Sequence, residues 1–148
     1  MSNLDPELQT YLREARLHLA SQRGEIENVL QFLKEGDDVN FFDEIGYAPL
    51  HYAVEYEKYE VIEILLKNGA NINAHDEKTI GNTPLGNVTG ECSLKMAKYL
   101  LEKGANPNIR GWMRLNALDR AEKNASTEGD EMLRLLKKYS SKYPKEDI

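Results

Sequence analysis

Three histidines and a single cysteine are the side chains best suited to catalysis or metal binding in this chain. His18 and His51 each lie within an apolar stretch, whereas His75 is followed by two carboxylates. Three consecutive ligands cannot easily converge on one ion, and Cys92 lacks the second cysteine of a C-x-x-C pair. The chain also contains no phosphate-binding glycine loop, zinc spacing or EF-hand loop. We therefore predict that it is not an enzyme, holds no metal or cofactor, and takes no small-molecule substrate.

Composition narrows the remaining classes of function. One cysteine excludes an internal disulfide and fits a reducing compartment. The longest apolar run is far shorter than the roughly 18 residues that span a membrane. The first residues lack the basic segment and apolar core of a secretory signal. These features predict a cytoplasmic protein without membrane contact.

Charge is unevenly distributed along the chain. The net charge is -6; residues 1–74 hold 6 Lys/Arg and 14 Asp/Glu, and residues 75–148 hold 13 and 11. Nucleic-acid binding requires clustered positive charge, so we predict no nucleic-acid partner. The acidic half has two open interpretations: it attracts a basic protein surface, or it aids solubility.

One stretch, residues 43–76, has the pattern of a complete structural unit. Asp43 and Gly46 favour a tight turn, and Pro49 favours the first position of a short helix. A second helix is predicted from about Tyr59, and Gly69 is placed to end it. Two short helices cannot bury so many apolar residues alone, so the unit needs copies of itself on either side.

The copies are present at a period near 33 residues, which is typical of a stacked repeat array. Leu50 recurs as Leu17, Leu85 and Leu118, Gly69 recurs as Gly36 and Gly104, and the asparagines that follow these glycines are Asn40, Asn73 and Asn108. Ala48-Pro49-Leu50-His51 and Thr83-Pro84-Leu85 match the Thr-Pro-Leu-His motif of ankyrin repeats, and residues 69–73 and 104–108 match its Gly-Ala-Asp-Val-Asn ending. Over residues 15–139 the chain thus resembles the ankyrin-repeat family.

This resemblance implies an all-α solenoid of about four repeats with short β-hairpin fingers, the terminal repeats being degenerate caps. We predict one domain over 1–148, with repeats at about 5–42, 43–76, 77–110 and 111–142 and a tail at 143–148. The family uses the register of His18 and His51 for hydrogen bonds within and between repeats, so the resemblance implies structural roles for both.

The helices at the N-terminal end follow from caps and periodicity. Asp5 and Pro6 favour the start of a long first helix, on which Leu8, Leu12, Ala15 and Leu19 share one face. A second helix, residues 25–35, is predicted to turn Ile26, Val29, Leu30 and Leu33 inward.

The first helix of the third repeat departs from the pattern. Gly86 and Gly90 each lower helix propensity by about 1 kcal/mol relative to Ala, which predicts a short or irregular helix after Pro84. Two interpretations stay open: the missing side chains open a notch for a partner, or the helix ends early without consequence.

A solenoid offers its fingers and first helices as a concave binding surface. We predict that Trp112 is its strongest contact residue, because a tryptophan on a turn must pack or bind; the alternative is packing against Ile80 and Ile109. We also expect at least one of the apolar finger residues at 42, 45 and 47 to be exposed. The full predicted binding set is Phe42, Glu44, Ile45, Tyr47, Tyr52, Glu55, Tyr56, Glu77, Lys78, Ile80, Asn82, Asn87, Glu91, Trp112, Met113, Arg114, Arg120 and Lys123.

These features predict a non-enzymatic module that binds another protein. The small size and the acidic half resemble those of bacterial ankyrin proteins that neutralise a toxin, which implies an immunity protein whose concave face covers a basic toxin domain. Two alternatives remain open: an adaptor or regulator that recognises a host or housekeeping protein, and a structural subunit of a larger assembly.

Overall fold

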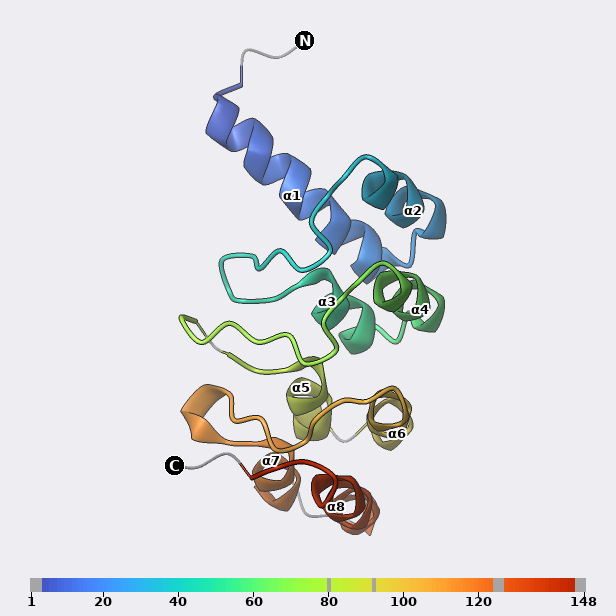
Figure 1. Ribbon diagram of the computed structural model, residues 1–148, viewed down its shortest axis with the longest axis vertical. Helices are drawn as coiled ribbons and strands as arrows, with labels where there is room; N and C mark the ends of the chain where they lie inside the picture. Colours follow the sequence, from blue (N-terminus) through green and yellow to red (C-terminus); the bar gives the residue numbers. More distant parts are fainter. Residues whose placement is uncertain (1–3, 80, 92, 124–126, 146–148) are drawn as a thin grey trace. The chain divides into compact units, whose positions relative to one another are not determined.

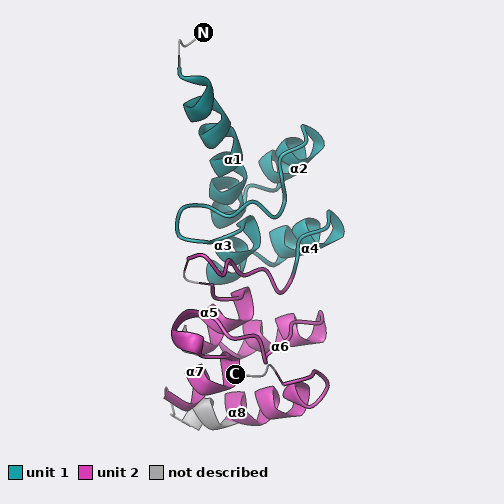
Figure 2. Cartoon of the chain, turned by 60° about the vertical axis from the view of Figure 1, so that its left-hand side comes forward, with its two compact units in different colours: residues 1–71 teal, residues 72–148 magenta. Residues whose placement is uncertain are grey.

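A computed structural model describes residues 4–79, 81–91, 93–123 and 127–145, without the side chains of 90, 91 and 127–130. The chain forms two compact units, Met1–Asn71 and Ile72–Ile148 (Figure 2). Within the described residues there are eight α-helices, one short 3-10 helix and no strand. No described helix is both long and apolar enough to cross a bilayer.

Unit 1 contains two pairs of helices (Figure 1). They are α1 (Pro6–Arg23), α2 (Ile26–Lys34), α3 (Pro49–Glu55) and α4 (Tyr59–Lys67). Helix α1 packs against α2 and α3, and α4 packs against α3 and α2, so each pair lies on the next. The centre of this unit is fully buried and consists of Leu17, Val29, Leu50, Ile62 and Leu65.

Unit 2 repeats this arrangement (Figure 1). Its helices are α5 (Pro84–Glu91), α6 (Leu94–Glu102), η1 (Trp112–Arg114), α7 (Ala117–Lys123) and α8 (Thr127–Ser140). Helices α5 and α7 pack together, and α6 and α8 pack behind them. Its core includes Leu85, Met96, Leu100, Leu101 and Leu136. The predicted helical repeats are therefore confirmed, whereas the single domain over 1–148 stays a prediction.

Local sequence signals set the ends of several helices. Asp5 caps α1 by accepting a hydrogen bond from the backbone N–H of Glu7 at 3.0 Å, and Pro6 occupies the first turn, as predicted. Gly36, Gly69 and Gly104 have φ values of +94°, +91° and +100° just after α2, α4 and α6. Only glycine adopts this left-handed conformation without steric cost, which explains why a glycine recurs after each of these three helices.

The recurring asparagines join each repeat to the following loop. In unit 1, Asn40 Nδ2 donates to Gly69 O at 3.0 Å, and its Oδ1 accepts from Asn71 N at 2.7 Å. In unit 2, Asn73 Oδ1 accepts from Asn106 N at 2.7 Å. Asn108 Nδ2 lies 3.1 Å from three carbonyl oxygens, that of Ser140 at the end of α8 and those of Tyr143 and Pro144 just after it.

Three sequence predictions need correction. The fingers are turns rather than the expected β-hairpins in the described residues: the second-repeat finger is closed by backbone hydrogen bonds from Asp43 N to Tyr47 O at 2.9 Å and from Gly46 N to Asp43 O at 3.0 Å. A segment this short leaves no room for a ladder of strand hydrogen bonds. Leu30, expected to face inward, is 48% exposed on α2.

The third correction concerns α5, which is a continuous helix of 8 residues despite its glycines. Leu85, Val88 and Thr89 on this helix are at most 3% exposed. The Thr83 hydroxyl also accepts from the backbone N–H of Gly86 at 3.0 Å, which caps the first turn. Tertiary burial therefore outweighs the low intrinsic propensity of Gly86 and Gly90.

Candidate protein-binding surface

The finger of the second repeat is held by the carboxylate of Asp43. Its Oδ1 accepts from the backbone N–H groups of Ile45 at 3.1 Å and Tyr47 at 2.9 Å, and its Oδ2 accepts from the Tyr52 hydroxyl. Gly46 completes the turn with a φ of +80°. The result is a fixed loop whose tip presents Ile45, 47% exposed.

A cluster of rings supports this finger from below. Tyr47 stacks on His51 with centroids 4.9 Å apart and meets Tyr52 edge-on at 5.5 Å. Tyr52 in turn contacts the His18 ring at 5.8 Å. Burial, followed by the hydrogen bond to Asp43, raises the pKa of the Tyr52 hydroxyl, so it stays a neutral donor.

The two histidines have the structural roles implied by the resemblance. His18 is 5% exposed, and its Nε2 lies 2.8 Å from Phe41 O and 3.0 Å from Tyr47 O, so this nitrogen donates to the finger backbone. His51 is 1% exposed, and its Nδ1 accepts from Ala48 N at 3.0 Å. Both rings therefore connect first helices to fingers.

The finger of the fourth repeat is the most exposed apolar turn of unit 2 among the described residues. Backbone hydrogen bonds close it from Gly111 N to Leu115 O at 3.0 Å and from Arg114 N to Gly111 O at 2.9 Å. Met113 and Arg114 have φ values of +58° and +59°, an unfavourable conformation for residues with a Cβ. At its tip, Trp112 is 54% and Met113 62% exposed.

Two side chains from neighbouring elements brace this strained turn. Asn82 Oδ1 accepts from Trp112 N at 2.8 Å and from Arg120 Nη2 at 2.7 Å, while the same Arg120 Nη2 donates to Trp112 O at 3.0 Å. Asn82 Nδ2 also donates to Asn87 Oδ1 at 3.0 Å. Gly111 allows this close approach, because a Cβ there would lie 2.3 Å from Asn82 Oδ1.

The space beside Gly86 is filled rather than open. A Cβ added at Gly86 would meet Thr83 Oγ1 at 3.3 Å and Arg120 Nε at 4.0 Å. Of the two interpretations of this glycine-rich helix, a notch for a partner therefore finds no support. The early end without consequence is also wrong, since α5 is complete to Glu91.

The structure sorts the predicted binding residues by exposure. Asn82 is buried, and Asn87 and Arg120 are half-buried members of the brace rather than free contact residues. Phe42, Tyr47 and Tyr52 are also half-buried. Ile80, the alternative packing partner of Trp112, and the side chain of Glu91 lie outside the described part of the chain. The exposed members are Glu44, Ile45, Glu55, Tyr56, Glu77, Lys78, Trp112, Met113, Arg114 and Lys123.

Sequence reasoning missed the residues that position the two fingers. Asp43 was recognised as a turn residue, but its bond to the Tyr52 hydroxyl was not foreseen. Arg110 Nη1 donates to Arg114 O at 2.8 Å and lies 3.6 Å from Asp119 Oδ2, which adds a third support to the strained turn. For Gly111, the available sequence signal was a glycine placed immediately before a tryptophan.

The described side chains include no group of three His, Cys, Asp or Glu residues that could hold a metal ion. His75 approaches one carboxylate, with its Nε2 3.7 Å from Glu77 Oε1, and its Nδ1 lies 2.9 Å from Asn73 O. The exposed finger residues, by contrast, include aromatic, apolar and charged side chains of the kinds that bind proteins.

Comparison with known proteins agrees with this architecture. A family model described as ankyrin repeats (3 copies) matches residues 3–76, and a single ankyrin-repeat model matches residues 80–112. The chain is 31% identical to the mouse B-cell lymphoma 3 protein homolog over 109 residues, 73% of this chain and 24% of that protein. It is 35% identical to a putative ankyrin repeat protein of fowlpox virus over 99 residues, 66% of this chain and 29% of that protein.

A putative ankyrin repeat protein of Rickettsia bellii is 36% identical over 88 residues, 55% of this chain and 50% of that protein. The chain therefore covers at most half the length of these relatives, which come from an animal, a virus and a bacterium. Ankyrin repeats are a non-enzymatic fold that mediates protein–protein interaction. With paired helices in both units and family models matched across residues 3–76 and 80–112, this chain belongs to the ankyrin-repeat family.

Proposed function

We propose that this chain binds its partner protein through its fingers and first helices, and that the turn Trp112–Arg114 is the principal anchor in unit 2. One observation carries the proposal: an exposed Trp, Met and Arg occupy a turn whose unfavourable backbone is held in place from three sides. Trp and Arg are the residue types that most often dominate binding energy.

The strain in this turn supports a binding role. Each residue held at positive φ costs about 1–2 kcal/mol, and such strain persists where surrounding contacts over-determine it. Asn82, Arg110 and Arg120 supply those contacts. A turn fixed before binding loses little conformational entropy on association, which favours affinity.

Unit 1 contributes a second candidate surface. Ile45 and Tyr56 are each 47% exposed, and Glu44 and Glu55 are exposed beside them in sequence. This mixture of apolar and acidic side chains fits a partner surface that carries basic residues around an apolar centre.

More specifically, we propose an immunity protein that neutralises a toxin of the same cell. The support is the resemblance to small ankyrin antitoxins and the acidity of residues 1–74, which have a net charge of -8. Such acidity accelerates encounter with a basic toxin domain. The exposed finger side chains would then cover the toxin's active surface.

The anchor is tested by purifying the tagged chain from its native cell and measuring its affinity for the protein that is recovered with it. Substituting Trp112→Ala should weaken partner affinity by at least about 30-fold, the equivalent of about 2 kcal/mol. Leu30→Ala is the matched control, because Leu30 on α2 is 48% exposed and lies outside the proposed surface. If Trp112→Ala and Tyr56→Ala both leave affinity unchanged while Leu30→Ala abolishes it, the surface assignment is wrong.

Co-expression with the product of the neighbouring gene tests the immunity role. We expect that product to be lethal alone, harmless together with this chain, and toxic again with the Trp112→Ala variant. Recovery of several weakly bound partners would instead identify an adaptor. Recovery only within one large complex would identify a structural subunit.

A further inference from the structure

Helix α1 has a second apolar face that is exposed within unit 1. Leu8, Leu12 and Leu19 are 43%, 50% and 45% exposed, and Tyr11 beside them is 41% exposed. With Ala15, the three leucines follow the 4-3-4 spacing of a helix–helix seam. At about 100° per residue they lie opposite Leu17, which is fully buried.

The register of the repeats shows what this face would contact in an array. Leu19 occupies the position held by Tyr52 in the second repeat and Arg120 in the fourth. Tyr52 contacts His18 of the preceding repeat, and Arg120 bonds to Asn82 of the finger before it. In the second, third and fourth repeats the same register also bonds to the finger that precedes its own helix, so it contacts that finger and, in the second and fourth repeats, the preceding repeat as well. At Leu19 it carries an aliphatic side chain left open in unit 1.

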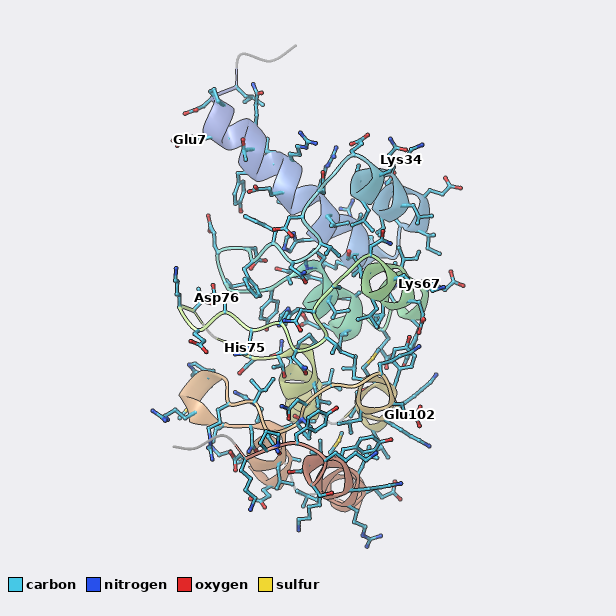
Figure 3. The ribbon with its side chains drawn as sticks, in the orientation of Figure 1. Glu7, Lys34, Lys67, His75, Asp76 and Glu102 are labelled. Carbon is cyan, nitrogen blue, oxygen red and sulfur yellow. The ribbon has the colours of Figure 1, made fainter. Side chains whose placement is uncertain are left out.

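The helix is also longer than its counterparts. Helix α1 has 18 residues, whereas α3 has 7 and α5 has 8. Figure 1 shows its N-terminal turns projecting away from α2, α3 and α4. Glu7 marks this projecting end in Figure 3. Leu8 and Leu12 thus extend the open face along the projecting half of the helix.

We propose that this face of α1 docks against the same face of a second copy of this chain, with the two helices antiparallel. The seam is nearly symmetric about its middle, so one two-fold axis sets Leu8 against Leu19 of the second copy and Leu12 against its Ala15. Each contact then occurs twice, as an interface between identical subunits requires. Alternation of a large and a small side chain lets the helices approach closely.

Charge selects the antiparallel direction. Asp5 and Glu7 lie at the N-terminal end of α1, and Arg23, whose Nη1 also lies 3.8 Å from Glu25 Oε1, lies in its last turn. An antiparallel pair brings each acidic end beside a basic end and opposes the two helix dipoles. A parallel pair would set like charges together and align the dipoles.

The size of the seam sets the expected strength. Leu8 to Leu19 spans about 16 Å at 1.5 Å per residue, so the contact is smaller than the roughly 800 Å² per partner of a standard stable interface. We therefore expect a reversible dimer with a Kd of about 10 µM. The fingers are not part of this contact, so the dimer and the proposed partner binding can succeed or fail separately.

Sedimentation equilibrium of the full chain tests the dimer. We expect a monomer–dimer equilibrium, and we expect Leu12→Glu combined with Leu19→Glu to raise the Kd at least about 100-fold while far-UV circular dichroism stays unchanged. Ile45→Glu is the matched control, because Ile45 is 47% exposed in the same unit and should leave dimerisation intact. A chain that stays monomeric at about 200 µM, or a dimer that the Leu12→Glu, Leu19→Glu double variant preserves, overturns the proposal.

Disulfide trapping tests the direction of the pair. In a Cys92→Ser background, which removes the sole native cysteine, Leu8→Cys and Leu19→Cys chains are mixed and oxidised. The antiparallel seam predicts mixed dimers that join position 8 to position 19. Disulfides formed mainly between identical chains would overturn the antiparallel arrangement.

Discussion

At the scale of single residues, Tyr52 connects three parts of unit 1. Its hydroxyl donates to Asp43 in the finger, and its ring contacts Tyr47 and His18. Burial and the carboxylate of Asp43 both raise the pKa of this hydroxyl. The contacts that fix the finger therefore also keep the hydroxyl of Tyr52 protonated in the folded state.

A pH dependence follows from that raised pKa. An unfolded tyrosine releases its proton near pH 10, whereas folded Tyr52 retains it, so its contribution to stability is complete below pH 10 and is lost at higher pH. We expect the free energy of unfolding to fall between about pH 10 and pH 11, and to fall less steeply in Tyr52→Phe. Urea titrations across this range provide the measurement. An equal slope in Tyr52→Phe and in the wild type would contradict this account.

At the scale of elements, the fourth-repeat finger depends on one close approach. Gly111 lies against Asn82, whose Oδ1 accepts hydrogen bonds from Trp112 N and Arg120 Nη2. A Cβ at position 111 would also come within 2.9 Å of Gly81 O. A methyl group would therefore push the finger away from its support.

We accordingly expect Gly111→Ala to lower the free energy of unfolding by about 1–3 kcal/mol, as overpacking does at buried sites. Urea denaturation gives the value. Gly86→Ala is the control: its Cβ would approach the Thr83 hydroxyl at 3.3 Å, and the gain of about 1 kcal/mol in helix propensity offsets that contact. If the two variants have equal stability, Gly111 is not the residue that permits the brace.

Elements set by one residue or its immediate neighbours could be predicted from the sequence, whereas elements set by contacts with distant residues could not. The left-handed turns at Gly36, Gly69 and Gly104 follow from the sterics of one residue, and the cap at Asp5 from its immediate neighbours. Helix α5 was misjudged because its stability comes from burial by other elements.

The candidate surface shows the same limit. The exposed tip at Trp112 was anticipated. The brace formed by Asn82 and Arg120 was not, because its hydrogen bonds join residues 30 and 38 positions apart, which a sequence pattern does not show. Periodicity also could not show that Leu19 and Leu30 are exposed. An apolar face is visible in a sequence, whereas the neighbour that covers it is not.

At the scale of the whole molecule, the same asparagine joint recurs along both units. Asn40 and Asn73 each accept a backbone N–H from the loop that follows the next helix pair, and Asn108 binds the chain after α8. Asn108 itself is 5% exposed, so its loss removes part-buried hydrogen bonds to the carbonyl oxygens of Ser140 and Tyr143.

We expect Asn108→Ala to reduce the free energy of unfolding by about 1–3 kcal/mol, measured by urea denaturation. Asn28→Ala serves as the control, since Asn28 is exposed and its side chain bonds only to Glu25 among the hydrogen bonds described for it. A change below about 0.5 kcal/mol in Asn108→Ala would show that this joint does not stabilise the last repeat.

The asparagine joint also bears on how such a chain can vary. Its amide meets mainly main-chain atoms of the receiving loop, which every amino acid supplies except for the N–H of proline. The separation between asparagine and receiving N–H is 31 residues for Asn40 and 33 for Asn73, yet the contact distance is 2.7 Å in both. Evolution can therefore lengthen a finger or rewrite its side chains, and so change what the protein recognises, while the connection between neighbouring repeats is preserved.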